Sequence, residues 1–494
     1  MKNGKDRESS FKSKLSYGLA DIYGGGAFVV ISTFYTVFLT KALGMNPALA
    51  GTIPFIGKIW DAVTDPIMGN ICDRTKSRFG AKRFYILVGS FISAITFILM
   101  WLKIGSDSMT VNYIFYMLMY MLFSTGFTIV MVPYNGLLPD MVDDYTGRGK
   151  FSAVRMICST FGAIIAGLIP TLLIKDNTNP SPYLLTAVIF GVIFLAVILL
   201  TFFGTWEKQK EPVRVSFSQS FTQSLTVYKS RSFRLFIGIF LAGQGAADFV
   251  TGLAVYYVDD VLNAYGGGRF TYLMGVLLLA QFVGTILFGP IMAKTSKKAP
   301  LLIGFPVRIL ATLALLFFSH EGVPFIAILA LSFIIGLGMA GSSTTIYAIL
   351  ADMADVDELI TSISRAGTVS AMATFIRKIA TGLSSAIIGL LLAMVGYSES
   401  LANSGARQAL STQRGIALIY IFVPIVLMAL AIFFTVVFPV KKHEFEIVKK
   451  EIARRKGEDG SKATAEEKAV IEKVTGFKFE QLWKRDNALK LNGK

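Results

Sequence analysis

The sequence predicts an all-α membrane protein, with twelve transmembrane helices in two six-helix bundles. This prediction rests on the apolar composition, on the number of long apolar runs and on an internal repeat. Of the 494 residues, 53% are hydrophobic and 16% are charged, and the mean hydropathy is +0.60. A soluble globular protein does not carry so many separate apolar runs of more than about 18 residues, so a soluble class is excluded.

Each apolar run is long enough to cross the hydrocarbon core as a helix, which takes about 20 residues. We expect helices over residues 18–43, 47–72, 84–105, 111–139, 151–174, 183–204, 233–258, 270–293, 300–318, 323–350, 366–396 and 414–439. The first run follows a polar start and is too long for a cleaved signal peptide, so we expect it to be retained as a span.

Basic residues gather in a few loops and give the chain a net charge of +16. They lie before the first run, between the second and third runs, after the eighth run and throughout the tail after residue 440. Cytoplasmic loops of membrane proteins carry an excess of Lys and Arg. We therefore expect a multi-pass protein of the inner (plasma) membrane with both termini in the cytoplasm. This pattern indicates the lipid bilayer as partner and does not indicate nucleic acid.

The second half of the chain repeats the first. Gly69–Arg78 after the second run is echoed by Gly289–Lys298 after the eighth. Leu137–Asp143 at the end of the fourth run is echoed by Ile349–Asp355 at the end of the tenth. Two six-helix halves with parallel repetition are typical of major facilitator transporters, whose site lies between the halves near the middle of the membrane.

The repeat predicts four segments: an N-terminal bundle over residues 1–204, a cytoplasmic connector over 205–231, a C-terminal bundle over 232–440 and a charged cytoplasmic tail over 441–494. The connector predicts an amphipathic helix on the membrane surface, because apolar residues recur in it at helical spacing, namely Phe217, Phe221, Leu225 and Tyr228. In the tail, Thr464 followed three residues later by Glu467 predicts a capping box that opens a short helix.

Two acids lie one helical turn apart inside the second run. Asp61 and Asp65 share one face of a helix because they are four positions apart. A carboxylate near the bilayer centre costs about 2.5–3.5 kcal/mol, so two of them require a charged partner or an aqueous cavity. Pro66 has no N–H and leaves the carbonyl of Ala62 without its helical donor. These oxygens suit a small hard cation such as Na⁺ or H⁺; the alternative is that the acids bond neighbouring helices or share a proton.

Several motifs along the membrane part match one known family. The most specific is the run from Ile59 to Gly69, and the others are Lys14–Gly18, Thr75–Gly80, Pro133–Tyr134, Arg148–Arg155, Asp352–Glu358, Lys378 and Gly396–Tyr397. With these motifs the chain resembles the glycoside–pentoside–hexuronide:cation symporter family. The resemblance implies a secondary transporter, not an enzyme, that moves a glycoside, pentoside, hexuronide or oligosaccharide by alternating access. It implies no cofactor other than the coupling ion, Na⁺ or H⁺.

In the family, the acids that match Asp61 and Asp65 bind the coupling cation. Thr64 offers a neutral oxygen, although Thr is also common where membrane helices pack together. Lys378 in the eleventh run is the expected counter-charge, because two carboxylates and one ammonium leave a single negative charge for one cation to neutralise. We expect the neutral site to reorient and the empty site to resist reorientation. The alternative for Lys378 is a side chain that reaches the membrane interface, and the role of the neighbouring Arg377 is open.

Asp21 and Arg155 are assigned to the substrate. Asp21 can accept two sugar hydroxyls, and Arg155, which matches a family arginine, can donate to two hydroxyls or to a carboxylate. The sugar-binding acid of one family member falls four residues after Asp21, where this chain has Gly25. Many relatives carry an acid at the Asp21 position, and a structural role for it is equally open. The alternative for Arg155 is an anchor that pairs with Asp140 or Asp143.

The resemblance places four further residues in the substrate cavity, where they offer polar contacts: Lys58, Tyr134, Asn135 and Thr374. Asn135 stands where a family member has an aromatic residue that stacks on the sugar, which argues against galactoside-like selectivity. Asp248 in the seventh run has no clear counterpart in the family. We assign it to a different substrate or to a second proton site.

Charged residues recur at helix ends of both halves, on the side expected to be cytoplasmic. We interpret them as an inner gate, whose ion pairs are closed when the site faces outward and broken when it faces inward. The set is Asp73, Arg74, Arg78, Asp140, Asp143, Arg148, Asp352, Asp355 and Arg365. For any one of them, capping of a helix end is the alternative.

Two other functions are compatible with the same sequence: a sodium-dependent carrier of lysolipids or other amphiphiles, and a sensor that binds sugar without moving it. We predict no metal site, because His320 and His443 are far apart and unaccompanied. We predict no structural disulfide, because the two cysteines, Cys72 and Cys158, both fall near helix ends expected to be cytoplasmic. We expect a monomer.

Overall fold

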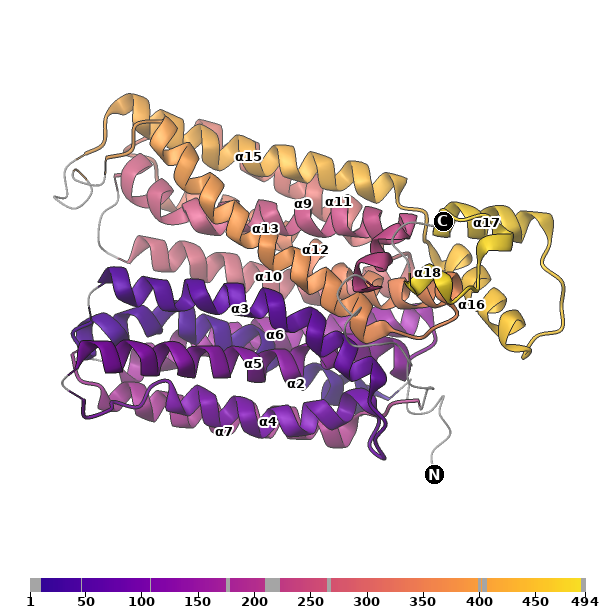
Figure 1. Ribbon diagram of the computed structural model, residues 1–494. Helices are drawn as coiled ribbons and strands as arrows, with labels where there is room; N and C mark the ends of the chain where they lie inside the picture. Colours follow the sequence, from indigo (N-terminus) through magenta and orange to yellow (C-terminus); the bar gives the residue numbers. More distant parts are fainter. Residues whose placement is uncertain are drawn as a thin grey trace. The chain divides into compact units, whose positions relative to one another are not determined.

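The computed structural model describes residues 10–45, 47–106, 108–174, 178–208, 223–263, 268–398, 401 and 407–489, and these residues form helices and loops without a strand. Twelve helices are long, and their bounds are α2 (Phe11–Val30), α3 (Pro47–Arg74), α4 (Ala81–Leu99), α5 (Met109–Met141), α6 (Tyr145–Leu173), α7 (Ser181–Gly204), α9 (Arg231–Tyr256), α10 (Arg269–Lys294), α11 (Ala299–Ala314), α12 (Phe325–Thr361), α13 (Ala366–Met394) and α15 (Leu410–Val437) (Figure 1). The π-helical turns η1 (Ile31–Tyr35) and η2 (Phe38–Ala42) extend α2, η5 (Tyr257–Val261) extends α9, and the 3₁₀ turn η6 (Leu315–Phe317) extends α11.

Eleven helices of the described chain are long and apolar enough to cross a membrane. The exception among the twelve is α3, which coincides with the second predicted run. Its apolar stretch is interrupted by Lys58, Asp61 and Asp65, and these side chains lower its hydropathy. The helix that looks least like a membrane span is therefore the one that carries the predicted cation site.

The chain divides into two compact units. Unit 1 comprises Met1–Arg231, Leu350–Phe375 and Lys442–Lys494, and unit 2 comprises Ser232–Ile349 and Ile376–Lys441. The boundary after Arg231 is the one expected between connector and second bundle. The end of α12, the start of α13 and the tail, however, pack within unit 1.

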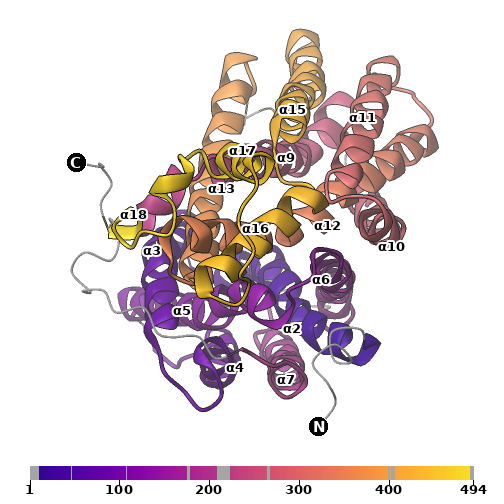
Figure 2. The ribbon, with the colours of Figure 1, turned by 90° about the vertical axis from the view of Figure 1, so that its right-hand side faces the viewer.

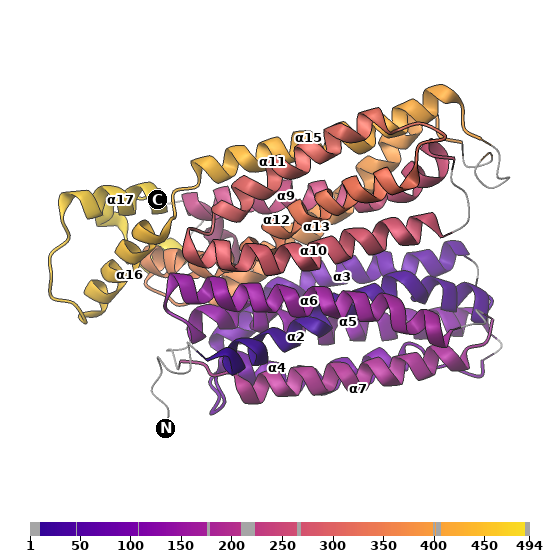
Figure 3. The same cartoon turned by 180° about the vertical axis from the view of Figure 1, so that it is seen from behind.

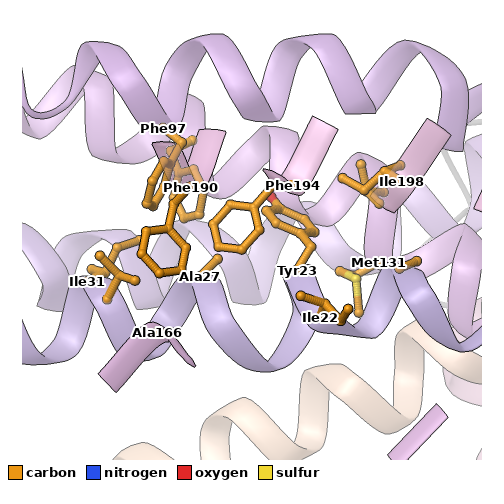
Figure 4. Close-up of a cluster of buried hydrophobic side chains, with 14 of the residues drawn as sticks. Ile22, Tyr23, Ala27, Ile31, Phe97, Met131, Ala166, Phe190, Phe194 and Ile198 are labelled. Atoms are coloured by element: carbon orange, nitrogen blue, oxygen red, sulfur yellow. The ribbon is translucent and has the colours of Figure 1, made fainter. Parts of the chain in front are cut away.

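Unit 1 has an aromatic core between α2, α4 and α7. Tyr23 of α2 contacts Phe194 of α7 edge to face, with ring centroids 5.2 Å apart, and Phe97 of α4 contacts Phe194 at 5.3 Å (Figure 4). Such aromatic pairs stabilise a packed interior beyond the area that they bury. This core holds together the helices that position the polar residues of the unit.

Glycines let α2 and α6 approach closely. A Cβ atom at Gly162 would lie 2.5 Å from the carbonyl oxygen of Ile22, and one at Gly25 would lie 2.3 Å from that of Ser159. Small residues at such contacts allow membrane helices to pack backbone against backbone. Gly25 is the position where one family member has its sugar-binding acid, and the packing of α2 on α6 leaves no room for a side chain there.

Replacing Gly162 with Ala should destabilise the protein, by about 1–3 kcal/mol, because the added methyl group must push α2 away from α6. Gly167→Ala on the same helix is the matched control, since a Cβ there meets no atom within 4 Å. Thermal unfolding of the purified proteins in detergent measures the difference. Equal transition temperatures for the two variants would show that the close approach is not needed.

Unit 2 is likewise held together by aromatic contacts and by close helix packing at glycines. Tyr257 of η5 stacks on Tyr420 of α15 with ring centroids 4.3 Å apart. A Cβ at Gly338 of α12 would lie 2.6 Å from the carbonyl oxygen of Gly304 in α11. Figure 3 shows α10, α11 and α15 of this unit from behind.

The tail forms three helices in unit 1: α16 (Lys442–Lys456), α17 (Ala465–Thr475) and α18 (Asp486–Leu489) (Figure 2). The predicted capping box is confirmed, since Thr464 Oγ1 accepts the Glu467 amide and Glu467 Oε2 accepts the Thr464 amide. In the connector, Phe217 and Phe221 lie outside the described residues. Leu225–Lys229 form a 3₁₀ turn, η4, in which the Tyr228 hydroxyl donates to the Met372 carbonyl at 2.9 Å.

Candidate functional site

The two acids of α3 face two hydroxyls of α5. Asp61 and Asp65 are 4% and 1% exposed. The hydroxyl of Ser124 donates to Asp61 Oδ1, and the hydroxyl of Thr128 donates to Asp65 Oδ1 at 2.8 Å. Both pairs are four residues apart on their own helix, so α3 and α5 pack in register and the four side chains form two rungs. We call this set the oxygen ladder.

The oxygen ladder offers several oxygen ligands of the kind that hard cations prefer. A hydroxyl that donates to a carboxylate keeps its lone pairs for a cation. Thr64, the third predicted ligand, instead donates its hydroxyl to the Asp61 carbonyl of its own helix at 3.3 Å. Ser124 and Thr128 were missed at the sequence level, although two hydroxyls four positions apart in an apolar run are a signal that could have identified them.

The cationic residues predicted near the acids belong to unit 2. Lys378 is half-buried on α13. Its neighbour Arg377 donates from both Nη atoms to the two carboxylate oxygens of Asp248 on α9, each at 2.7 Å. Asp248 has no counterpart in the family pattern, and Arg377 is its ion-pair partner in this structure.

Four of the predicted substrate residues come together in unit 1. Arg155 of α6 donates from Nε to Asp21 Oδ2 at 2.9 Å and from Nη2 to Asn135 Oδ1 at 2.6 Å. Its guanidinium carbon lies 4.5 Å from the ring centroid of Tyr134. The Tyr134 hydroxyl in turn donates to the Tyr17 carbonyl at 2.9 Å. Asp21, rather than Asp140 or Asp143, is thus the acid that the structure places against Arg155.

The other two predicted substrate residues of unit 1 lie apart from this cluster. Lys58 is exposed on α3. Thr374 of α13 donates its hydroxyl to the Ser370 carbonyl of its own helix at 3.0 Å. Neither residue makes a contact with Asp21 or Arg155 among the contacts of the described side chains.

Most of the predicted gate residues form ion pairs at the end of unit 1 that carries the tail, and we call this set of ion pairs the gate network. Arg148 is completely buried, and its Nη1 lies 2.5 Å from Asp355 and 3.3 Å from Asp352 of α12. Its other donors reach the carbonyls of Val142 and Pro139 at 2.8 and 3.3 Å. A buried arginine with this many partners ties the start of α6 to the end of α12.

Asp73 ties the end of α3 to the start of α13. Its carboxylate accepts the amide of Gly367 at 3.0 Å and both the amide and hydroxyl of Thr368, at 2.7 and 2.8 Å. A carboxylate at a helix N-terminus satisfies amides that have no partner in their own helix. The sequence left two roles open for Asp73, a gate residue or a helix cap. Asp73 combines them, because it lies at the end of α3 and caps the N-terminus of α13.

Lys82, absent from the predicted set, joins the gate acids. It lies 2.5 Å from Asp140 and 3.9 Å from both Asp73 and Glu207. Burial raises the pKa of Glu207, and the charge of Lys82 opposes this rise. Arg365 pairs with Asp357 through two hydrogen bonds of 2.7 and 2.9 Å.

The two remaining predicted gate residues, Arg74 and Arg78, are less buried than most of the others. Arg78 is exposed, with its guanidinium carbon 4.7 Å from the ring centroid of Phe79. Arg74 is half-buried and lines a small polar pocket with Asn70, Arg365 and Ala488.

The tail adds charges to the gate. Lys449 of α16 lies 3.5 Å from Asp143 and 3.4 Å from Asp355, and Asp143 also pairs with Lys208. Lys456 lies 2.6 Å from Glu358 at the end of α12. The sequence offered no way to choose these lysines, because the tail is dense in basic residues that look alike.

The known proteins that this chain resembles are described as symporters, carriers or transporters. A family model described as MFS/sugar transport protein matches residues 16–442. An uncharacterized symporter of Bacillus subtilis is 26% identical and covers 87% of this chain and 92% of its own. A glucuronide carrier protein homolog of Escherichia coli is 26% identical, covering 91% and 97%. An isoprimeverose transporter of Lactiplantibacillus pentosus is 26% identical, covering 86% and 88%.

A solved structure shows the same fold. A Major Facilitator Superfamily transporter in the outward conformation matches with a TM-score of 0.60 and 15% identity, covering 87% of this chain and 98% of its own. At this identity the similarity concerns the fold alone. It confirms the predicted fold class.

Proposed function

The chain belongs to the family of MFS sugar transport proteins, and from that premise we propose that it carries a small glycoside, pentoside or hexuronide inward together with Na⁺ or H⁺. The family and its relatives make it a membrane transporter of sugars and not an enzyme. We therefore propose three properties: the coupling ion, the direction of transport and the substrate class.

The oxygen ladder is the observation that carries the proposal. Two buried carboxylates one turn apart repel each other and are costly to hold in a membrane, unless a cation neutralises them. Ser124 and Thr128 donate one hydrogen bond each to the acids, which orients the carboxylates and still leaves them negative. A Na⁺ ion bound to these oxygens, or protons, would lower the negative charge of the oxygen ladder.

Arg155 and its partners supply the substrate side of the proposal. The Arg155 guanidinium donates hydrogen bonds to the Asp21 carboxylate and to the Asn135 side-chain oxygen, and it lies over the Tyr134 ring. These three contacts fix its orientation. A guanidinium fixed in this way can donate to sugar oxygens in a defined direction. The gate network of Arg148, Asp352 and Asp355 would close the inner side, with both termini in the cytoplasm, while the site is open to the outside.

The coupling gives a useful concentrating force. Each cation that enters down a potential of 100 mV contributes about 2.3 kcal/mol, which corresponds to about 50-fold accumulation. Without a cation, the same carrier would only equilibrate its substrate.

Uptake into proteoliposomes tests the proposal. Purified protein is supplied with labelled methyl glucoside, methyl xyloside and methyl glucuronide under an inward Na⁺ gradient, an inward proton gradient or no gradient. We expect concentrative uptake of at least one sugar under one gradient and its loss on addition of an ionophore. Uptake that is equal in all three conditions would contradict coupling, and lysolipid uptake that is unaffected by the sugars would favour an amphiphile carrier.

A further inference from the structure

Three charged side chains gather in the interior of unit 2 with an excess of positive charge. Asp248 comes from α9, Arg308 from α11 and Arg377 from α13. Arg377 donates one hydrogen bond to each carboxylate oxygen of Asp248, both at 2.7 Å. Arg308 lies close enough to Asp248 to interact with it electrostatically. Two guanidiniums and one carboxylate leave this cluster, which we call the arginine cluster, with one net positive charge.

Arg308 has unused hydrogen-bonding capacity. It is 0% exposed, and its Nη2 donates to the Ala246 carbonyl at 2.7 Å. Its Nε and Nη1 have no hydrogen-bond partner among the described protein atoms. A buried donor without an acceptor costs about 1–3 kcal/mol, and more when it is charged. Such a group can take a further acceptor, such as a water, an anion or a rearranged side chain.

The Arg377–Asp248 pair is accessible, although it lies within helices that cross the membrane. The two side chains are 19% and 21% exposed, whereas those of Arg155 and Asp21 are 2% and 5% exposed. Charges in a membrane span face a bundle interior or a water-filled cavity, because contact with lipid is too costly. The exposed edges of this pair therefore face an aqueous space that a solute can enter.

We propose that the arginine cluster binds the anionic group of the transported molecule, a sugar acid that carries a carboxylate or sulfonate. This inference rests on the proposed transport function and narrows its substrate class. Arg377 is the residue that contacts the anion, and Asp248 is an internal carboxylate that occupies Arg377 while no substrate is bound. One monoanion brings the charge of the cluster to zero, which a neutral sugar cannot do.

Geometry supports this assignment of roles. A guanidinium binds carboxylates and similar oxyanions by two parallel hydrogen bonds, as Arg377 binds Asp248 here. A substrate anion that takes this place displaces Asp248. Arg308 already interacts electrostatically with Asp248, and its Nε and Nη1 can donate to the displaced carboxylate. Arg308 is thus a positioning residue, and it acts on the substrate only through Asp248.

Binding measurements on the purified protein in nanodiscs, with and without Na⁺, test the proposal. The probes are pairs that differ in one group: 4-nitrophenyl β-glucuronide against the glucoside, galacturonate against galactose, and sulfoquinovose against glucose. We expect the acid of at least one pair to bind about tenfold more tightly than its neutral partner. Arg377→Gln should abolish this preference. Arg407→Gln is the matched control, because Arg407 pairs with Glu321 at an exposed position.

Variants of Asp248 and Arg308 test whether the substrate anion displaces Asp248 from Arg377, or whether Asp248 and Arg377 form a purely structural ion pair. Asp248→Asn should increase the affinity for the acid about threefold or more, because it removes the internal competitor. Arg308→Met should lower that affinity, and the double variant Asp248→Asn with Arg308→Met should restore it. A structural pair predicts the reverse, with weaker binding and a lower unfolding temperature in Asp248→Asn.

The outcomes distinguish this inference from the transport function. If neutral sugars bind as well as their acids in every pair, the arginine cluster is not an anion site, and cation-coupled sugar transport still stands. If only neutral sugars bind, the inference is overturned in the same way. If no member of any pair binds with or without Na⁺, both the inference and the proposed function are wrong.

Discussion

Arg148→Met is expected to be among the most damaging substitutions in this protein. It leaves the carboxylates of Asp352 and Asp355 buried without the guanidinium that lies 3.3 and 2.5 Å from them. Loss of one member of a buried ion pair costs about 3–5 kcal/mol, because the remaining charge stays buried without compensation. The midpoint of thermal unfolding in detergent should fall clearly below that of the unmodified protein.

Two further variants show whether the charge is the cause. Arg78→Met removes an exposed arginine and should leave the midpoint unchanged. Adding Asp355→Asn to Arg148→Met should recover part of the loss, because it removes one of the two buried carboxylates that have lost the guanidinium. A midpoint that is insensitive to Arg148→Met would show that the network at this end of unit 1 does not stabilise the fold.

Asp65→Asn is expected to uncouple transport from the cation gradient. The amide keeps the size of the side chain and its acceptor oxygen for Thr128, but it removes a charge from the oxygen ladder. We expect concentrative uptake to be lost, while exchange of labelled for unlabelled substrate across the liposome membrane continues. Gradient-driven uptake that survives in Asp65→Asn would rule out the oxygen ladder as the cation site.

Thr128→Val tests the hydroxyl that the sequence did not reveal. It keeps the shape of the side chain and removes the donor that lies 2.8 Å from Asp65. We expect the cation concentration for half-maximal uptake to rise about tenfold, as follows from loss of one hydrogen bond to a charged group. Thr186→Val is the control, since the Thr186 hydroxyl donates to a carbonyl of its own helix, that of Pro182, at 2.8 Å.

The fold could be predicted because it depends on patterns that are local in the sequence. Long apolar runs define the helices, and the capping box at Thr464 is a four-residue signal that forms as expected. The spacing of Asp61 and Asp65 likewise placed both acids on one face of α3. These features need only helical periodicity and the cost of placing charges in lipid.

Partners between helices could not be predicted in the same way. Arg155 had acids at several positions as candidate partners, and only the packing of α2 on α6 brings Asp21 to it. Lys82 and Lys449 each join the gate through contacts between segments that are far apart in the chain. Arg308 went unnoticed because a single arginine in an apolar run gives no sign of how deeply it is buried.

The docking of the C-terminal segment has a practical consequence for experiments on this protein. The backbone amides of Trp483 and Lys484 donate to the carbonyls of Leu359 and Ile360 at 3.0 and 3.3 Å, and so they cap the last turn of α12. Lys449 lies between Asp143 and Asp355 at the same end. Any motion that separates α6 from α12 must rearrange these contacts. Shortening the chain before Trp483 would remove this cap on α12 and would therefore change the rate of such a motion.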